Sequence, residues 1–145
     1  MKRPALYATS FLLLFAASIV ALGLGAAVDS PRSLMSPVDY AAGKREIEVA
    51  ARRAIGQCRA EVGANRDLCK AQARAEERVQ RAQLAARYLG TAAAAADVRQ
   101  ARVKARYDVE RVRCDVDSSG AVSKCLRAAR DARDRALAEA SPSAT

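Results

Sequence analysis

Two pairs of cysteines constrain the fold more than any other feature of this chain. Cys58 and Cys69 have ten residues between them, and Cys114 and Cys125 repeat that spacing 56 residues later. Residues eleven apart on one continuous helix lie about 16 Å apart along its axis, whereas a disulfide needs Cα atoms within about 7 Å. A glycine-containing turn between the cysteines of each pair would bring them together at the closed end of a helical hairpin. We therefore predict local disulfides within each pair.

A crosswise pairing is the alternative. Eleven residues rotate a helix by about 1100°, which returns to within about 20° of the same face. Two continuous antiparallel helices could then be joined by bridges from Cys58 to Cys125 and from Cys69 to Cys114. This arrangement requires both intervening segments to be helical, and their turn-forming residues oppose that. The sequence therefore favours local pairing.

The first 27 residues have the order of a secretory signal peptide. Lys2 and Arg3 precede an apolar run from Phe11 to Leu22, and the small residues Gly25 to Ala27 follow it. We predict cleavage after residue 27. An uncleaved anchor is the alternative, because residues 5–28 are long enough to cross a bilayer. Both interpretations predict that the rest of the chain is exported, since the basic start stays inside.

The cysteines are predicted to be structural rather than catalytic. An even number of cysteines in an exported chain favours disulfides. Zinc sites usually draw ligands from closely spaced pairs, often with histidine, and this chain has no histidine. No Cys-x-x-Cys pair and no base for a nucleophilic thiol are present. We expect no enzyme activity, metal or cofactor, and the predicted site residues are the disulfide cysteines Cys58, Cys69, Cys114 and Cys125.

Helix-forming residues dominate from residue 37 onward. The segment Ser36-Pro37-Val38-Asp39 predicts a helix start with a hydroxyl cap and proline in the first turn. We expect Asn65 to cap the second helix, Gly90 to end it, and Thr91 to cap the third. A turn is expected at residues 117–120. The predicted helices cover residues 37–62, 66–89, 92–116 and 121–140.

These elements predict an all-α fold of two αα-hairpins, a helical bundle or an extended coiled-coil-like array, each hairpin closed by a local disulfide. The predicted organisation is a signal peptide or anchor at 1–27, a linker at 28–36, hairpins at 37–90 and 91–140, and a tail at 141–145.

The apolar faces of the predicted helices are thin. Hydrophobic residues make up 51% of the chain, alanine is the commonest of them, and there is no tryptophan. Burial contributes about 25 cal/mol per Å² of apolar area, so an alanine-rich core is marginal without cross-links. The predicted stripes are Leu68, Ala75, Val79 and Ala86; Val98, Ala105, Val109, Val112 and Val116; and Val122, Leu126, Ala129 and Ala136.

The chain is basic. Cleavage would remove Lys2 and Arg3, leaving 23 of the 25 Lys and Arg against 16 Asp and Glu, a net charge of +7. Such a field would concentrate the protein near anionic envelope components, but the interpretation that the sequence favours is a solvated helix surface with mixed charges. We expect no nucleic-acid binding, because Tyr88 and Tyr107 lie apart and no aromatic pair is expected. Partners would be envelope proteins, an anionic envelope surface or a second copy.

The stretches "YDVERVRC" (Tyr107–Cys114) and "CRAEVGANRDLCKAQARAEERVQRAQLAARY" (Cys58–Tyr88) resemble repeats in exported, alanine-rich helical proteins of Gram-negative bacteria. Those proteins are mostly uncharacterised, and some are labelled TolA-like or cell envelope biogenesis. The resemblance covers residues 40–140 and implies a periplasmic location and local disulfides, without an activity. The chain departs from the pattern at Ala51, where the repeat has tyrosine, and in the second turn, where the glycine is displaced to Gly120.

The expected function is that of a non-enzymatic periplasmic or cell-envelope protein, structural or interacting, stabilised by two disulfides. One alternative is a binding or stress-response protein whose basic face captures anionic envelope components. The other is a coiled-coil component anchored in the inner membrane.

Overall fold

The computed structural model describes residues 35–116 and 121–141, and all the regular structure in them is helical. The four α-helices are α1 (Pro37–Gln57), α2 (Gly63–Leu89), α3 (Ala92–Val116) and α4 (Val122–Ala140), with a short 3₁₀ turn, η1 (Cys58–Ala60), after α1. The all-α prediction is confirmed. The predicted signal peptide or anchor, most of the linker, the turn at 117–120 and most of the tail lie outside the described residues.

The helix starts predicted at Ser36 and Thr91 are confirmed. Ser36 precedes α1, and its hydroxyl accepts a hydrogen bond from the backbone N–H of Asp39 at 3.1 Å. The hydroxyl of Thr91 accepts one from the N–H of Ala94, also at 3.1 Å. Each bond satisfies a donor that the first helical turn leaves without a partner.

Gly90 ends α2 as predicted. Its φ of 63° is left-handed, and its N–H donates to the carbonyl of Ala86 at 2.9 Å. Glycine adopts this conformation without the steric cost that a Cβ would add.

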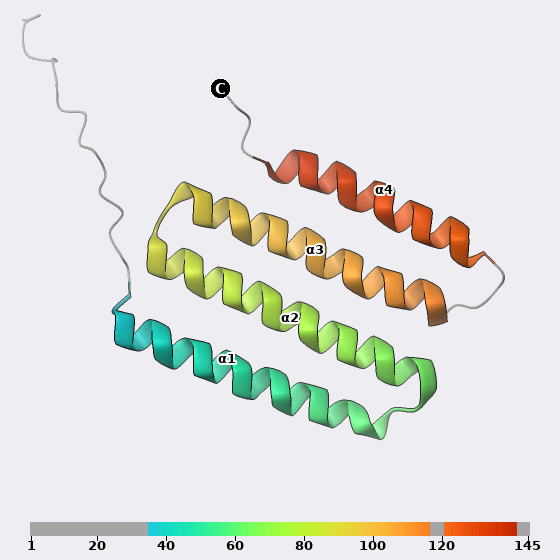
Figure 1. The fold of residues 1–145 in the computed structure, drawn as a ribbon, viewed down its shortest axis with the longest axis horizontal. Coiled ribbons are helices and arrows are strands. Elements are labelled where there is room, and N and C mark those ends of the chain that lie inside the picture. The colour runs from blue at the N-terminus through green and yellow to red at the C-terminus, as the bar shows by residue number, and fades with distance from the viewer. Residues whose placement is uncertain (1–34, 117–120, 142–145) are drawn as a thin grey trace, which may run out of the picture. The chain divides into compact units, whose positions relative to one another are not determined.

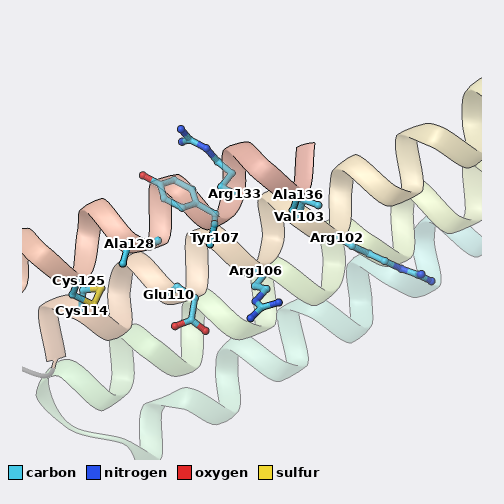
Figure 2. Close-up of a pocket in the computed structure, with 12 residues that line it drawn as sticks. Arg102, Val103, Arg106, Tyr107, Glu110, Cys114, Cys125, Ala128, Arg133 and Ala136 are labelled. Carbon is cyan, nitrogen blue, oxygen red and sulfur yellow. A yellow bond between two sulfur atoms is a disulfide. The ribbon is translucent and has the colours of Figure 1, made fainter. Parts of the chain in front are cut away.

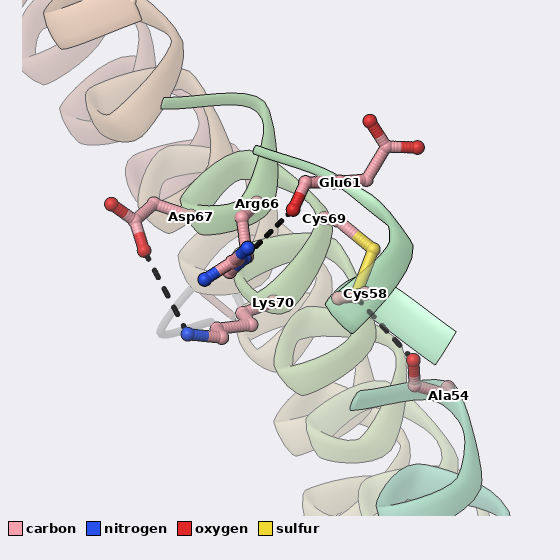
Figure 3. Close-up of polar contacts among 7 residues, drawn as sticks. All are labelled: Ala54, Cys58, Glu61, Arg66, Asp67, Cys69 and Lys70. Atoms are coloured by element: carbon pink, nitrogen blue, oxygen red, sulfur yellow. Dashed lines mark hydrogen bonds and ion pairs between the residues drawn. A yellow bond between two sulfur atoms is a disulfide. The ribbon is translucent and has the colours of Figure 1, made fainter. Parts of the chain in front are cut away.

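The turn between α1 and α2 lies earlier in the chain than predicted, and the prediction of Asn65 as a cap is wrong. The α-helix ends at Gln57 rather than at residue 62, and α2 already begins at Gly63, whose φ is 54°. Asn65 therefore lies inside the first turn of α2. The chain reverses at the left-handed glycine, and Arg66 Nε donates to the carbonyl of Glu61 at 2.7 Å across the turn (Figure 3).

Each helix packs against its neighbours in the chain: α1 against α2, α2 against α3, and α3 against α4. Within the described residues no other pair of α-helices is in contact, so the four helices form an open row (Figure 1). The ion pair between Arg78 of α2 and Asp108 of α3 links the two central helices. Because α2 and α3 also pack together, the division into two separate hairpins stays a prediction.

Among the residues that the structure describes, the buried set is small, and its largest aliphatic member is Leu84, which is 2% exposed. Leu84 faces α1 at Gly43, where a Cβ, if glycine carried one, would lie 3.0 Å from a Leu84 methyl group. The predicted stripe of α2 does not include Leu84, because it follows one face and a helix inside a row has two. Among the predicted stripe residues only Ala105 is fully buried, and the others are half-buried.

An aromatic pair that the sequence does not predict joins the start of α1 to the end of α2. The rings of Tyr40 and Tyr88 stack with centroids 4.3 Å apart and an angle of 13° between their planes. The ammonium group of Lys44 lies 5.1 Å from the centroid of the Tyr40 ring. The expectation that the chain has no aromatic pair is wrong, because the packing of α1 against α2 brings together residues 48 positions apart.

Candidate functional site

Both local disulfides predicted from the cysteine spacing are present. Cys58 bonds Cys69, and Cys114 bonds Cys125, each with Cα atoms 5.7 Å apart. Within the part of the chain that the structure describes, no cysteine is free. The crosswise pairing is not the one that the structure has.

The Cys58–Cys69 bridge joins η1 to the second turn of α2 (Figure 3). Cys58 is fully buried, and its Sγ lies 3.4 Å from the carbonyl oxygen of Ala54. Beside the bridge, Lys70 Nζ lies 4.0 Å from a carboxylate oxygen of the exposed Asp67. One sulfur of this disulfide is therefore shielded from solvent and lies against a backbone carbonyl.

The Cys114–Cys125 bridge lies at one end of a groove between α3 and α4 (Figure 2). The groove has a volume of about 470 Å³. Its lining consists of residues from one face of each helix: Arg102, Val103, Arg106, Tyr107, Glu110 and Cys114 of α3, and Cys125, Ala128, Ala129, Ala132, Arg133 and Ala136 of α4.

Tyr107 and Arg133 meet across this groove. The guanidinium of Arg133 lies over the Tyr107 ring, 4.5 Å from its centroid, and its Nε donates to Asp134 Oδ1 at 2.8 Å. This hydrogen bond raises the pKa of Arg133 and lowers the pKa of the Asp134 carboxyl below its usual value. Arg133 therefore carries its charge at every physiological pH, already paired with a carboxylate and an aromatic face.

The sequence does not identify this groove. The only hint of the groove in the sequence is the four-residue spacing of Val103 and Tyr107 and of Arg102 and Arg106. Residues four apart lie on the same face of a helix, so this spacing places an apolar row beside a basic row. That signal says nothing about the second wall, which depends on which face α4 turns toward α3.

No group of three or more candidate metal ligands exists within residues 35–116 and 121–141. Over the same residues, no helix has the length and hydropathy needed to cross a membrane. Comparisons with protein-family models, with curated proteins and with solved structures found no match to this chain.

Proposed function

We propose that this protein is a non-enzymatic structural or interaction module of the cell envelope, exported to the periplasm, whose row of helices is held in place by two disulfides. The observation that carries the proposal is the combination of two local cross-links with a core that consists almost entirely of small side chains. Disulfides form and persist in oxidising compartments, which agrees with the signal-like order of the first 27 residues.

The buried residues explain why cross-links are needed. Within residues 35–116 and 121–141 they comprise five alanines, two half-cystines and a single leucine: Ala51, Ala94, Ala96, Ala105, Ala140, Cys58, Cys114 and Leu84. A buried methyl group removes little apolar area from water, at about 25 cal/mol per Å². A disulfide that closes a loop of about twelve residues contributes roughly 3 kcal/mol, so two of them account for a large share of the stability of a small domain.

The arrangement of helices supports an interaction role. The outer helices α1 and α4 each pack against a single neighbouring α-helix of the described chain. Side chains on their other faces are exposed, among them Val38 and Val49 of α1, which are 75% and 50% exposed. The partners that we propose are envelope proteins or an anionic envelope surface.

The structural role is tested by removing one bridge at a time, with the paired variants C58S/C69S and C114S/C125S. We expect each pair of substitutions to lower the free energy of unfolding by roughly 3 kcal/mol, measured by chemical denaturation monitored by circular dichroism. The control is the variant with all four serines, whose stability should not change when a reductant is added. Equal stability of the oxidised and reduced wild-type protein would contradict the proposal.

Export to the periplasm and the pairing of the cysteines are tested by separate experiments. Fractionation of cells that produce the tagged full chain should recover it with periplasmic markers, and mass spectrometry of its N-terminus distinguishes cleavage after Ala27 from an intact anchor. Recovery with cytosolic markers would remove the proposed location. Peptide mapping under non-reducing conditions should yield Cys58–Cys69 and Cys114–Cys125 peptides, and a Cys58–Cys125 peptide would contradict local pairing.

A further inference from the structure

The Cys114–Cys125 bridge is the more exposed of the two disulfides. Both of its half-cystines line the groove between α3 and α4 (Figure 2). Cys125 is exposed, whereas in the first bridge Cys58 is fully buried and Cys69 is half-buried. Thiol–disulfide exchange requires access of a thiolate to one of the two sulfur atoms. The second bridge therefore offers the better point of attack, at Cys125.

The position of Cys125 in its helix also suits the chemistry of exchange. Cys125 lies near the start of α4, which begins at Val122, and its neighbour Lys124 is exposed. The N-terminus of a helix and an adjacent cation both stabilise a thiolate. Both effects favour the ionised form of Cys125 once the bridge has opened.

Few contacts other than this bridge hold α4. Within residues 35–116 and 121–141, α3 is the only α-helix that packs against it, and Ala140 is its only buried residue. No ion pair joins α3 to α4 within those residues. The polar contacts between the two helices are a hydrogen bond of 3.4 Å from Arg99 Nε to the Ala140 carbonyl and the guanidinium of Arg133 over the Tyr107 ring. A groove of about 470 Å³ between α3 and α4 shows that they pack loosely.

The first bridge, in contrast, is supported by close packing. Leu84 lies against Gly43 between α1 and α2, and the rings of Tyr40 and Tyr88 stack at the end of this interface that is opposite to the bridge. Opening the first bridge leaves α1 with a packed interface. Opening the second bridge leaves α4 with one buried alanine and a groove beside it.

We propose that the Cys114–Cys125 disulfide is a redox-controlled cross-link, which a dithiol opens to release α4 from α3. A thiolate of the dithiol attacks Sγ of Cys125, the S–S bond breaks, and the sulfur of Cys114 leaves as a thiolate that takes up a proton. The second thiol of the dithiol then attacks its own sulfur in the mixed disulfide and releases Cys125. The bridge is reduced to two thiols, the dithiol is oxidised to a disulfide, and its two protons pass to the protein.

Release of α4 turns the groove into an open surface of α3. Val103, Tyr107 and the new thiol of Cys114 lie on this surface, because all three line the groove from α3. The inference rests on the proposed role of the disulfides as structural cross-links, and it goes beyond that role by giving the second bridge a reversible function.

The test is hydrogen exchange of the oxidised full chain during a titration with dithiothreitol, measured at peptide resolution by mass spectrometry. Alkylation of samples taken in parallel reports which bridge is open. We expect amides of α4 to exchange at least about tenfold faster once Cys114–Cys125 is open, because the cross-link no longer restricts local opening. Amides of α1 and α2 should keep their protection while Cys58–Cys69 is closed, and reoxidation should restore the protection of α4.

Variants separate the two bridges. C114S/C125S should show the fast exchange of α4 without any reductant. The matched control is C58S/C69S, which removes a bridge of the same spacing and should leave the exchange of α4 unchanged. The wild-type titration needs no substitution, so it decides the question even where a variant does not fold.

Three outcomes would overturn the inference. Unchanged protection of α4 after the second bridge opens would mean that packing alone holds this helix. Simultaneous loss of protection in all four helices would mean that the second bridge stabilises the whole chain. Loss of α4 protection when only the first bridge opens would mean that the two bridges do not act separately. Failure of the structural role is a different result, namely an unchanged free energy of unfolding after both bridges are reduced.

Discussion

The four cysteines differ in exposure although their spacing is identical. Cys58 is fully buried and Cys114 is 1% exposed, whereas Cys69 is half-buried and Cys125 is exposed. Both bridges therefore have one protected sulfur, and they differ in how accessible the other one is. Because thiol–disulfide exchange requires in-line access of a thiolate to one sulfur, this difference affects the rate of reduction.

We expect a mild reductant to open Cys114–Cys125 before Cys58–Cys69, with attack at the exposed Cys125. Timed quenching with an alkylating reagent, followed by mass spectrometry of the peptides, measures the order. The variant C114S/C125S serves as a control, in which the first bridge should be reduced at its slower wild-type rate. Faster reduction of Cys58–Cys69 in the wild-type protein would contradict this interpretation of the burial.

At the scale of the elements, the two glycines inside α1 have different surroundings. Gly43 lies against Leu84, and a Cβ there would be 3.0 and 3.1 Å from the two Leu84 methyl groups. Gly56 has no atom within 4 Å of such a Cβ. Helix propensity alone predicts that both glycines weaken the helix. Gly43 also permits close approach of α1 and α2, because it leaves room for Leu84, the largest buried aliphatic side chain of the described residues.

We therefore expect opposite effects of the same substitution. Gly56→Ala should raise the free energy of unfolding by about 0.5–1 kcal/mol, because alanine loses less backbone entropy in a helix. Gly43→Ala should lower it by about 1 kcal/mol, since overpacking costs about 1–3 kcal/mol and exceeds that gain. Chemical denaturation with both disulfides intact measures the two changes, and stabilisation by both substitutions would show that Leu84 can move aside.

At the scale of the whole molecule, the helices pack in series rather than around one common core. Each of the central helices α2 and α3 packs against α-helices on two sides, and each outer helix against one. In such a linear arrangement, stability is the sum of the helices and of the contacts between neighbours. The outer helices have fewer interactions to lose when they open.

We expect native-state hydrogen exchange to reflect this order. Amides in α2 and α3 should be the most protected, and amides in α1 and α4 should exchange faster, because local opening of an outer helix breaks one interface rather than two. Exchange measured by mass spectrometry or NMR at peptide resolution tests the order. Protection of α4 equal to that of α3 would mean that its outer face is covered in solution.

The sequence by itself determined the local chemistry of this protein. The caps at Ser36 and Thr91, the end of α2 at Gly90 and the two local disulfides all depend on residues close together in the chain, and the sequence predicts all of them. The prediction that Asn65 caps α2 is wrong because α2 begins two residues earlier. It begins at Gly63, whose backbone is left-handed.

Only the tertiary structure decided which helix faces meet. The contact of Leu84 with Gly43, the stacking of Tyr40 on Tyr88 and the groove beside Tyr107 join residues from different helices. In a chain this rich in alanine, several faces of each helix are apolar enough to pack, so hydrophobic periodicity does not single out one of them. The choice depends on close fit between whole helices, which no short stretch of sequence contains.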